Sequence, residues 1–72
     1  MPQQIGLGDN IVRNRRLSGL TQDELGSLLG VSAQAVSKWE RSLACPDIML
    51  LPQLAAVLGV TLDELFAPVT EE

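Results

Sequence analysis

Polar side chains recur at helical spacing over residues 32–41, where they form the part of the chain best suited to binding chemistry. Positions three and four apart share one face of a helix, so this face lies opposite the apolar Val36 and Trp39. It carries a small residue, an amide, a hydroxyl and two cations: Ala33, Gln34, Ser37, Lys38 and Arg41. Such a face can contact phosphates and base edges, and it can equally be a solvated surface. Trp39 is expected in the core rather than on a stacking surface, because it lies one turn from Val36.

The segment 20–40, LTQDELGSLLGVSAQAVSKWE, is typical of two short helices joined by a tight turn. Thr21 and Glu24 have the spacing of a capping box, in which each side chain satisfies a backbone N–H at the start of a helix. Gly30 is expected to end the first helix in a left-handed conformation, and Ser32 to cap the second. This pattern indicates a helix-turn-helix, a motif that presents its second helix to a DNA groove.

The rest of the chain carries further helix signals and no alternating strand pattern. We expect five helices: 7–18, 21–29, 32–41, about 50 or 51 to 58, and a short one that starts at Thr61. Pro52 fits a first helical turn, and Asp47 is expected to cap the turn before it. Gly59 should end the fourth helix, and Pro68 should end the fifth.

Apolar residues predict how the outer helices pack. The first helix should contribute Leu7, Ile11 and Leu17, and the fifth should contribute Leu62, Leu65 and Phe66. Thr61 and Glu64 form a second capping box at the start of the fifth helix. The predicted fold class is all-α, a compact five-helix bundle with the helix-turn-helix at its centre.

Length and composition favour one small domain. Seventy-two residues lie close to the lower limit for a domain that folds without disulfides or bound metal ions. The only aromatic residues are Trp39 and Phe66. Cys45 is the single cysteine, so an internal disulfide is excluded and a reducing compartment is expected. The sequence has neither a run of 18 apolar residues nor the pattern of a signal peptide, so we expect a soluble, cytoplasmic protein without membrane contact.

The net charge of −4 is unevenly distributed along the chain. All five cations lie within residues 11–41, where three acidic residues leave a net charge of +2. Residues 42–72 contain five acidic residues and no cation. This asymmetry is consistent with one cationic face turned towards a polyanion.

Enzymatic and metal chemistry find little support in the residue types. The chain has no histidine, Cys45 has no base partner in the sequence, and no glycine-rich phosphate loop is present. Asp63 and Glu64 are adjacent carboxylates, but they belong to the second capping box. We therefore predict no catalytic residues, no cofactor, no metal site and no small-molecule ligand.

The chain resembles the lambda-repressor-like, or Cro-type, helix-turn-helix regulators, also called the xenobiotic-response-element family. The resemblance covers about residues 7–66 and is carried by several motifs in order. They are GLTQ-x-x-L at 19–25, LGVS at 29–32, SKWE at 37–40, PD at 46–47 and LGV-x-LDELF at 58–66. Residues 1–6 are expected to be a flexible leader. The resemblance implies a DNA-binding domain at 7–67, followed at 68–72 by either a tail or the start of a linker.

The resemblance also implies roles for individual residues. Ala33, Gln34 and Lys38 match positions that face base edges in the major groove. Phosphate contacts are expected from five residues: Gln22, Arg15, Ser32, Ser37 and Arg41. Arg15 and Glu40 match an ion pair that ties the first helix to the end of the recognition helix. The partner is then double-stranded DNA, bound by a homodimer whose two recognition helices lie one helical turn apart, roughly 34 Å.

Several residues depart from the family's usual pattern. Arg41 and Ser42 stand where relatives often have Asn-Gly, so the turn loses its left-handed glycine and gains a cation. Asn14 replaces an aliphatic residue, which is expected to weaken packing of the first helix. Leu28 and Leu43 are apolar where the family is often polar, which is either incidental or the mark of a dimer contact. Together with the acidic half at 42–72, they motivate an alternative function as a protein-interaction module, antitoxin-like or antirepressor-like, with little DNA affinity.

Overall fold

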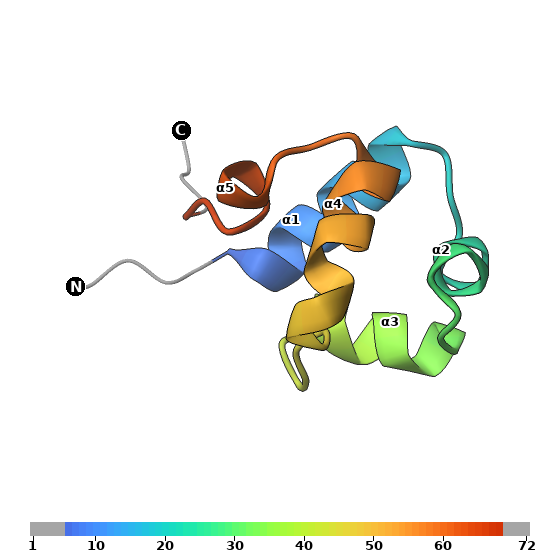
Figure 1. The fold of residues 1–72 in the computed structure, drawn as a ribbon. Coiled ribbons are helices and arrows are strands. Elements are labelled where there is room, and N and C mark those ends of the chain that lie inside the picture. The colour runs from blue at the N-terminus through green and yellow to red at the C-terminus, as the bar shows by residue number, and fades with distance from the viewer. Residues whose placement is uncertain (1–5, 69–72) are drawn as a thin grey trace.

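The computed structural model describes residues 6–68, so most of the expected leader and tail lie outside the described residues. Its elements are α1 (Leu7–Leu17), α2 (Gln22–Leu29), α3 (Ala33–Glu40), a 3-10 turn η1 (Ile48–Leu50), α4 (Leu51–Leu58) and α5 (Leu62–Leu65). In Figure 1, α4 crosses α1, with α2 and α3 on one side and α5 near the start of α1. The prediction of an all-α bundle of five helices is confirmed for these residues.

Local signals in the sequence set most helix ends. Both capping boxes form: the Thr21 and Thr61 hydroxyls accept from the backbone N–H of Glu24 and Glu64, whose carboxylates accept in return. Gly30 and Gly59 end α2 and α4 in left-handed conformations, as predicted. The helix ends are therefore properties of short segments of the sequence.

Two turns were also predicted from the sequence: the capped turn at Asp47, which is found, and the turn after α3, whose conformation differs from the prediction. Asp47 caps η1, where its carboxylate accepts from the backbone N–H of Met49 at 2.8 Å. The turn after α3 keeps its left-handed geometry without a glycine, because Ser42 has φ +61°. The loss of glycine from this turn therefore did not remove the left-handed conformation, and Ser42 carries the strain that a glycine would avoid.

Packing between helices holds these short elements together, since helices of eight residues are marginal in isolation. The core draws one to three side chains from each of the five helices. Its buried members are Ile11, Leu25, Leu29, Val36, Trp39, Leu54, Ala55, Leu58 and Leu65. The prediction that Trp39 is a core residue is confirmed.

The prediction that Leu17 contributes apolar contact was wrong. Its side chain is 77% exposed at the end of α1, where the chain turns towards α2. Leu62 is also more exposed than expected, because it lies on the outer side of the short helix α5. Gly6, which was assigned to the leader, is buried and immediately precedes α1.

Candidate nucleic-acid interface

The α2–turn–α3 unit is built from one cap at each junction. Gly30 turns the chain out of α2, and the Ser32 hydroxyl accepts from the backbone N–H of Ala35 at the start of α3. Between them, the N–H of Val31 donates to the carbonyl of Gly26 at 2.8 Å. The angle at which α3 leaves α2 is therefore fixed by backbone hydrogen bonds and one side-chain cap.

Gly26 allows the turn to approach α2 closely. A Cβ atom at this position would lie 2.6 Å from the carbonyl oxygen of Val31 and 3.2 Å from the carbonyl carbon of Ser32. No side chain other than hydrogen fits there without a shift of the turn. We did not predict this role, although an isolated glycine inside a helical pattern is a sign of close packing.

The outer face of α3 brings together four of the eight residues predicted for base and phosphate contact. Gln34, Ser37, Lys38 and Arg41 line one shallow surface depression. The Arg41 side chain folds back along the helix, with its Nε donating weakly to the carbonyl of Ser37 at 3.4 Å. The depression therefore offers one amide, one hydroxyl and two cations to a ligand.

Ala33 and Ser32 stand at the beginning of the same helix. Ala33 is half-buried at its first position, while the exposed Ser32 is its N-cap. The hydroxyl oxygen of Ser32 is occupied by the capping bond, but its hydrogen remains available for donation. The beginning of α3 therefore contributes a methyl group and one hydroxyl donor to this surface.

A polar network joins three helices at the other end of α3. The Glu40 carboxylate accepts from Arg15 Nε at 2.6 Å and from Arg15 Nη2 at 3.2 Å, which forms a bidentate ion pair between α3 and α1. Its Oε1 also accepts from Gln22 Nε2 at 2.9 Å, at the first residue of α2. A fourth bond, from Arg15 Nη1 to the carbonyl of Leu20 at 2.7 Å, ties in the connection between α1 and α2.

This geometry does not favour the phosphate contact expected of Arg15. The side chains of Arg15 and Glu40 are only 10% and 6% exposed, and three nitrogens of the guanidinium already donate to protein oxygens. A phosphate at van der Waals distance from the surface would find little of this side chain to contact. Arg15 is better described as a residue that holds α1 against the recognition helix.

The five cations consequently divide into two exposed pairs and one buried residue. Lys38 and Arg41 are exposed on and after α3, and Arg13 and Arg16 are exposed on α1.

Among the described residues, no three potential metal ligands gather in one group. No helix within residues 6–68 is long and apolar enough to cross a membrane.

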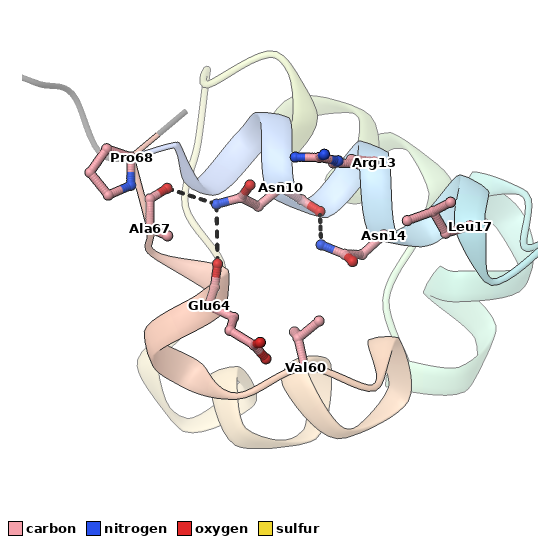
Figure 2. A pocket seen from close by; sticks show the side chains of 8 residues that line it. All are labelled: Asn10, Arg13, Asn14, Leu17, Val60, Glu64, Ala67 and Pro68. Carbon is pink, nitrogen blue, oxygen red and sulfur yellow. Dashed lines mark hydrogen bonds between the residues drawn. The ribbon is translucent and has the colours of Figure 1, made fainter. Parts of the chain in front are cut away.

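A second buried network, which we did not predict, ties α1 to the end of α5. The Nδ2 of Asn10 donates to the carbonyls of Leu65 and Ala67, both at 2.9 Å, and to that of Glu64 at 3.3 Å. Figure 2 shows the contacts to Glu64 and Ala67 beside a surface pocket that Asn14 also lines. Asn14 donates to the carbonyl of Asn10 at 2.8 Å, so its half-buried amide is satisfied within its own helix.

The two leucines that depart from the family pattern are both exposed. Leu28 on α2 is 53% exposed, and Leu43 after α3 is 66% exposed. Two further apolar side chains, Ile48 and Met49, are exposed in η1. Within residues 6–68, these side chains leave apolar surface exposed on α2, after α3 and in η1.

Comparison with known proteins identifies the class of protein that this fold and surface define. The helix-turn-helix family profile matches residues 11–65, so the chain belongs to this family. The resemblance predicted from the motifs is thereby confirmed. The comparisons do not favour the alternative of a protein-interaction module.

Individual relatives extend this assignment. The chain is 42% identical over 65 residues to the uncharacterized HTH-type transcriptional regulator y4dJ of Sinorhizobium fredii, covering 90% of this chain and 84% of that protein. Its structure is similar to the crystal structure of the P22 c2 repressor in complex with synthetic operator 9T, with a TM-score of 0.81 and 33% identity. That match covers 92% of this chain and 97% of the repressor chain.

The same fold is also found within a larger enzyme. The chain is similar to part of the hydroxypropylphosphonic acid epoxidase from S. wedmorenis, with a TM-score of 0.80 and 25% identity. The match covers 94% of this chain but only 36% of the epoxidase chain. Likeness of fold therefore does not by itself assign a function, which must be argued from the surface of the domain.

Proposed function

We propose that this protein is a transcriptional regulator that binds double-stranded DNA sequence-specifically, with α3 in the major groove. The observation that carries the proposal is the depression on α3, where Gln34, Ser37, Lys38 and Arg41 face outward together. It is supported by the family match and by the similarity to a repressor crystallised with a synthetic operator. The protein acts by binding rather than by catalysis, and it needs neither a metal nor a cofactor for this.

Base recognition in this proposal is sparse. The amide of Gln34 pairs with adenine through two hydrogen bonds, and Lys38 reaches guanine or a phosphate. Ala33 has only a methyl group, which can contact the methyl of thymine. A large share of the affinity therefore comes from phosphates and from the shape of the DNA.

Phosphate contacts in this proposal come from four residues around the recognition helix. Gln22 lies at the N-terminus of α2, where the helix dipole and free N–H groups favour an anion. Ser32 and Ser37 each offer a hydroxyl, and Arg41 offers a charge at the C-terminal end of α3. Arg15 supports these contacts from the interior instead of making one.

The protein is proposed to act as a homodimer on a palindromic site. Two recognition helices in successive major grooves lie about 34 Å apart, which sets the spacing of the half-sites. The exposed Leu28 and Leu43 are the candidates for contact between subunits. The relative y4dJ is bacterial, and a bacterial regulator meets its DNA in the cytoplasm, the compartment expected from the sequence.

Selection from randomised duplex DNA, sequenced at two salt concentrations, tests the proposal. We expect two related half-sites separated by about one helical turn. If Lys38 and Arg41 each neutralise one phosphate per subunit, the logarithm of the affinity should fall with the logarithm of salt at a slope of about −4 for the dimer. Affinity that does not respond to salt, or a pool without enriched sequences, contradicts the proposal.

Two arginine variants separate specific contacts from general charge. Arg41→Ala should make the slope shallower by about 2 for the dimer, because one phosphate contact is lost in each subunit. Arg13→Ala removes another exposed cation, on α1, and should leave the slope nearly unchanged. Equal effects of the two substitutions would mean that Arg41 makes no localised phosphate contact.

A further inference from the structure

In the described part of the chain, the amide of Gln22 has one polar partner, the Glu40 carboxylate. The bond runs from Gln22 Nε2 to Glu40 Oε1 at 2.9 Å, between residues that are 18 positions apart in the sequence. Ala33, which begins α3, has no polar side-chain atom that could hold this amide. The orientation of Gln22 therefore depends on the far end of the recognition helix and not on its beginning.

The chemistry of this bond decides which way the amide faces. A carboxylate accepts hydrogen bonds and donates none, so the nitrogen of Gln22 and not its oxygen must face Glu40. One N–H of the amide is thereby used, and the second N–H remains free for an anion beside the start of α2. Without the carboxylate, the amide could rotate and present its oxygen, which a phosphate would repel.

Glu40 is itself held in place by a charged partner. Arg15 donates two hydrogen bonds to the carboxylate from α1, and the Glu40 side chain is only 6% exposed. Because both oxygens accept from Arg15, the carboxylate cannot rotate away from Gln22 without losing part of the ion pair. The three side chains thus form one rigid unit that spans α1, α2 and α3.

We infer that Glu40 is a positioning residue for the DNA contact of Gln22, and that Arg15 acts on DNA only through it. The inference rests on the proposed function, since it says which residue orients Gln22 for one of the proposed phosphate contacts. It explains why a buried ion pair lies next to the binding surface: the pair fixes the orientation of the neutral side chain of Gln22. It also makes a distinction between Gln22, which needs Glu40, and Gln34, which does not.

A double-mutant cycle on the duplex recovered by the selection tests this inference. In the wild-type background, Gln22→Ala should weaken binding of the dimer about 30-fold, the value of one hydrogen bond in each of the two subunits. In an Arg15→Met/Glu40→Leu background, which replaces the ion pair by apolar groups, Gln22→Ala should cost less than about two-fold. Gln34→Ala, the matched control, should cost the same factor in both backgrounds.

Each other outcome overturns the inference. An equal loss on Gln22→Ala in both backgrounds would mean that Gln22 is oriented without Glu40. A parallel fall in the effects of Gln22→Ala and Gln34→Ala would mean that the pair only maintains the fold. Wild-type protein that shows no salt-dependent duplex binding refutes the proposed function itself, and this result is obtained before the cycle begins.

A second measurement examines the bond in the free protein. Circular dichroism first establishes that each variant is folded, and Arg15→Leu/Glu40→Met, a second apolar pair, replaces the first background if that one is not. In wild-type protein, the Nε2 protons of Gln22 should give resonances displaced from free-amide positions in a ¹⁵N-edited NMR spectrum, because one of them is hydrogen-bonded to Glu40. These should collapse towards free-amide positions when Glu40 is replaced, and resonances that do not move would contradict the inference.

Discussion

The buried amide of Asn10 provides a quantitative test of how the outer helices are held. Asn10→Ala removes a group whose two N–H bonds reach three carbonyls at the end of α5, two of them at 2.9 Å. Counting about 1 kcal/mol for each of two hydrogen bonds, the substitution should cost about 2 kcal/mol. A domain of this size has a free energy of unfolding of roughly 4–11 kcal/mol, so the loss is a large fraction of the total.

Thermal and urea unfolding, followed by the fluorescence of the buried Trp39, measure this loss. A decrease of 2 kcal/mol should lower the Tm by about 8–16 °C in a domain of this size. Asn14→Ala is the matched control, because it removes the same amide from the same helix but only one hydrogen bond, to Asn10. It should cost about 1 kcal/mol or less.

The Asn10→Asp variant sharpens the test by reversing the chemistry of the site. A carboxylate there faces three carbonyl oxygens and has no donor, so the protein should be less stable at neutral pH than the Asn10→Ala variant. Burial and the carbonyls raise the pKa of the introduced carboxyl in the folded state. A raised pKa means that stability is lost as pH rises through it, so this variant should regain stability on acidification relative to the wild type.

The comparison of the two alanine variants decides the test. If Asn10→Ala costs no more than Asn14→Ala, the reasoning is refuted.

Three further predictions concern the interface and are measured by urea titration with far-UV circular dichroism. Gly26→Ala should destabilise by about 1–3 kcal/mol, because the added Cβ would lie 2.6 Å from the Val31 carbonyl; a stabilised variant would show that helix propensity outweighs this contact. Ser42→Gly should stabilise by about 0.5–1 kcal/mol, since it relieves a left-handed φ of +61° at some entropic cost in the unfolded chain; a loss of stability argues against strain. Glu40→Ala should cost about 3–5 kcal/mol, because it leaves Arg15 buried without its carboxylate partner. Arg15→Met/Glu40→Leu should be nearly neutral, since it removes both charges. Similar losses of stability in the two variants would contradict the electrostatic explanation.

Most of the fold could be predicted from the sequence because its signals are local. The helix starts at Thr21 and Thr61 depend on residues three positions apart, and the ends at Gly30 and Gly59 depend on a single residue that tolerates positive φ. The outward-facing residues of α3 follow from helical periodicity alone. The family resemblance then placed these pieces in one known arrangement.

The tertiary structure decided how residues distant in sequence share their hydrogen bonds. Asn10 and Leu65 are 55 positions apart, and no spacing rule connects an amide in one helix to a carbonyl in another. Such outcomes depend on where helices cross, which is a property of the whole fold.

The recognition helix shows both kinds of information side by side. The sequence by itself determined that the chain forms a helix-turn-helix and that Gln34, Ser37, Lys38 and Arg41 share one face, because these facts depend on neighbours within one turn. Only the tertiary structure decided that Arg15 is enclosed and that Glu40 bonds Gln22. Three helices must meet before a charged side chain loses its solvent and finds its partners, so burial cannot be read from the residue type.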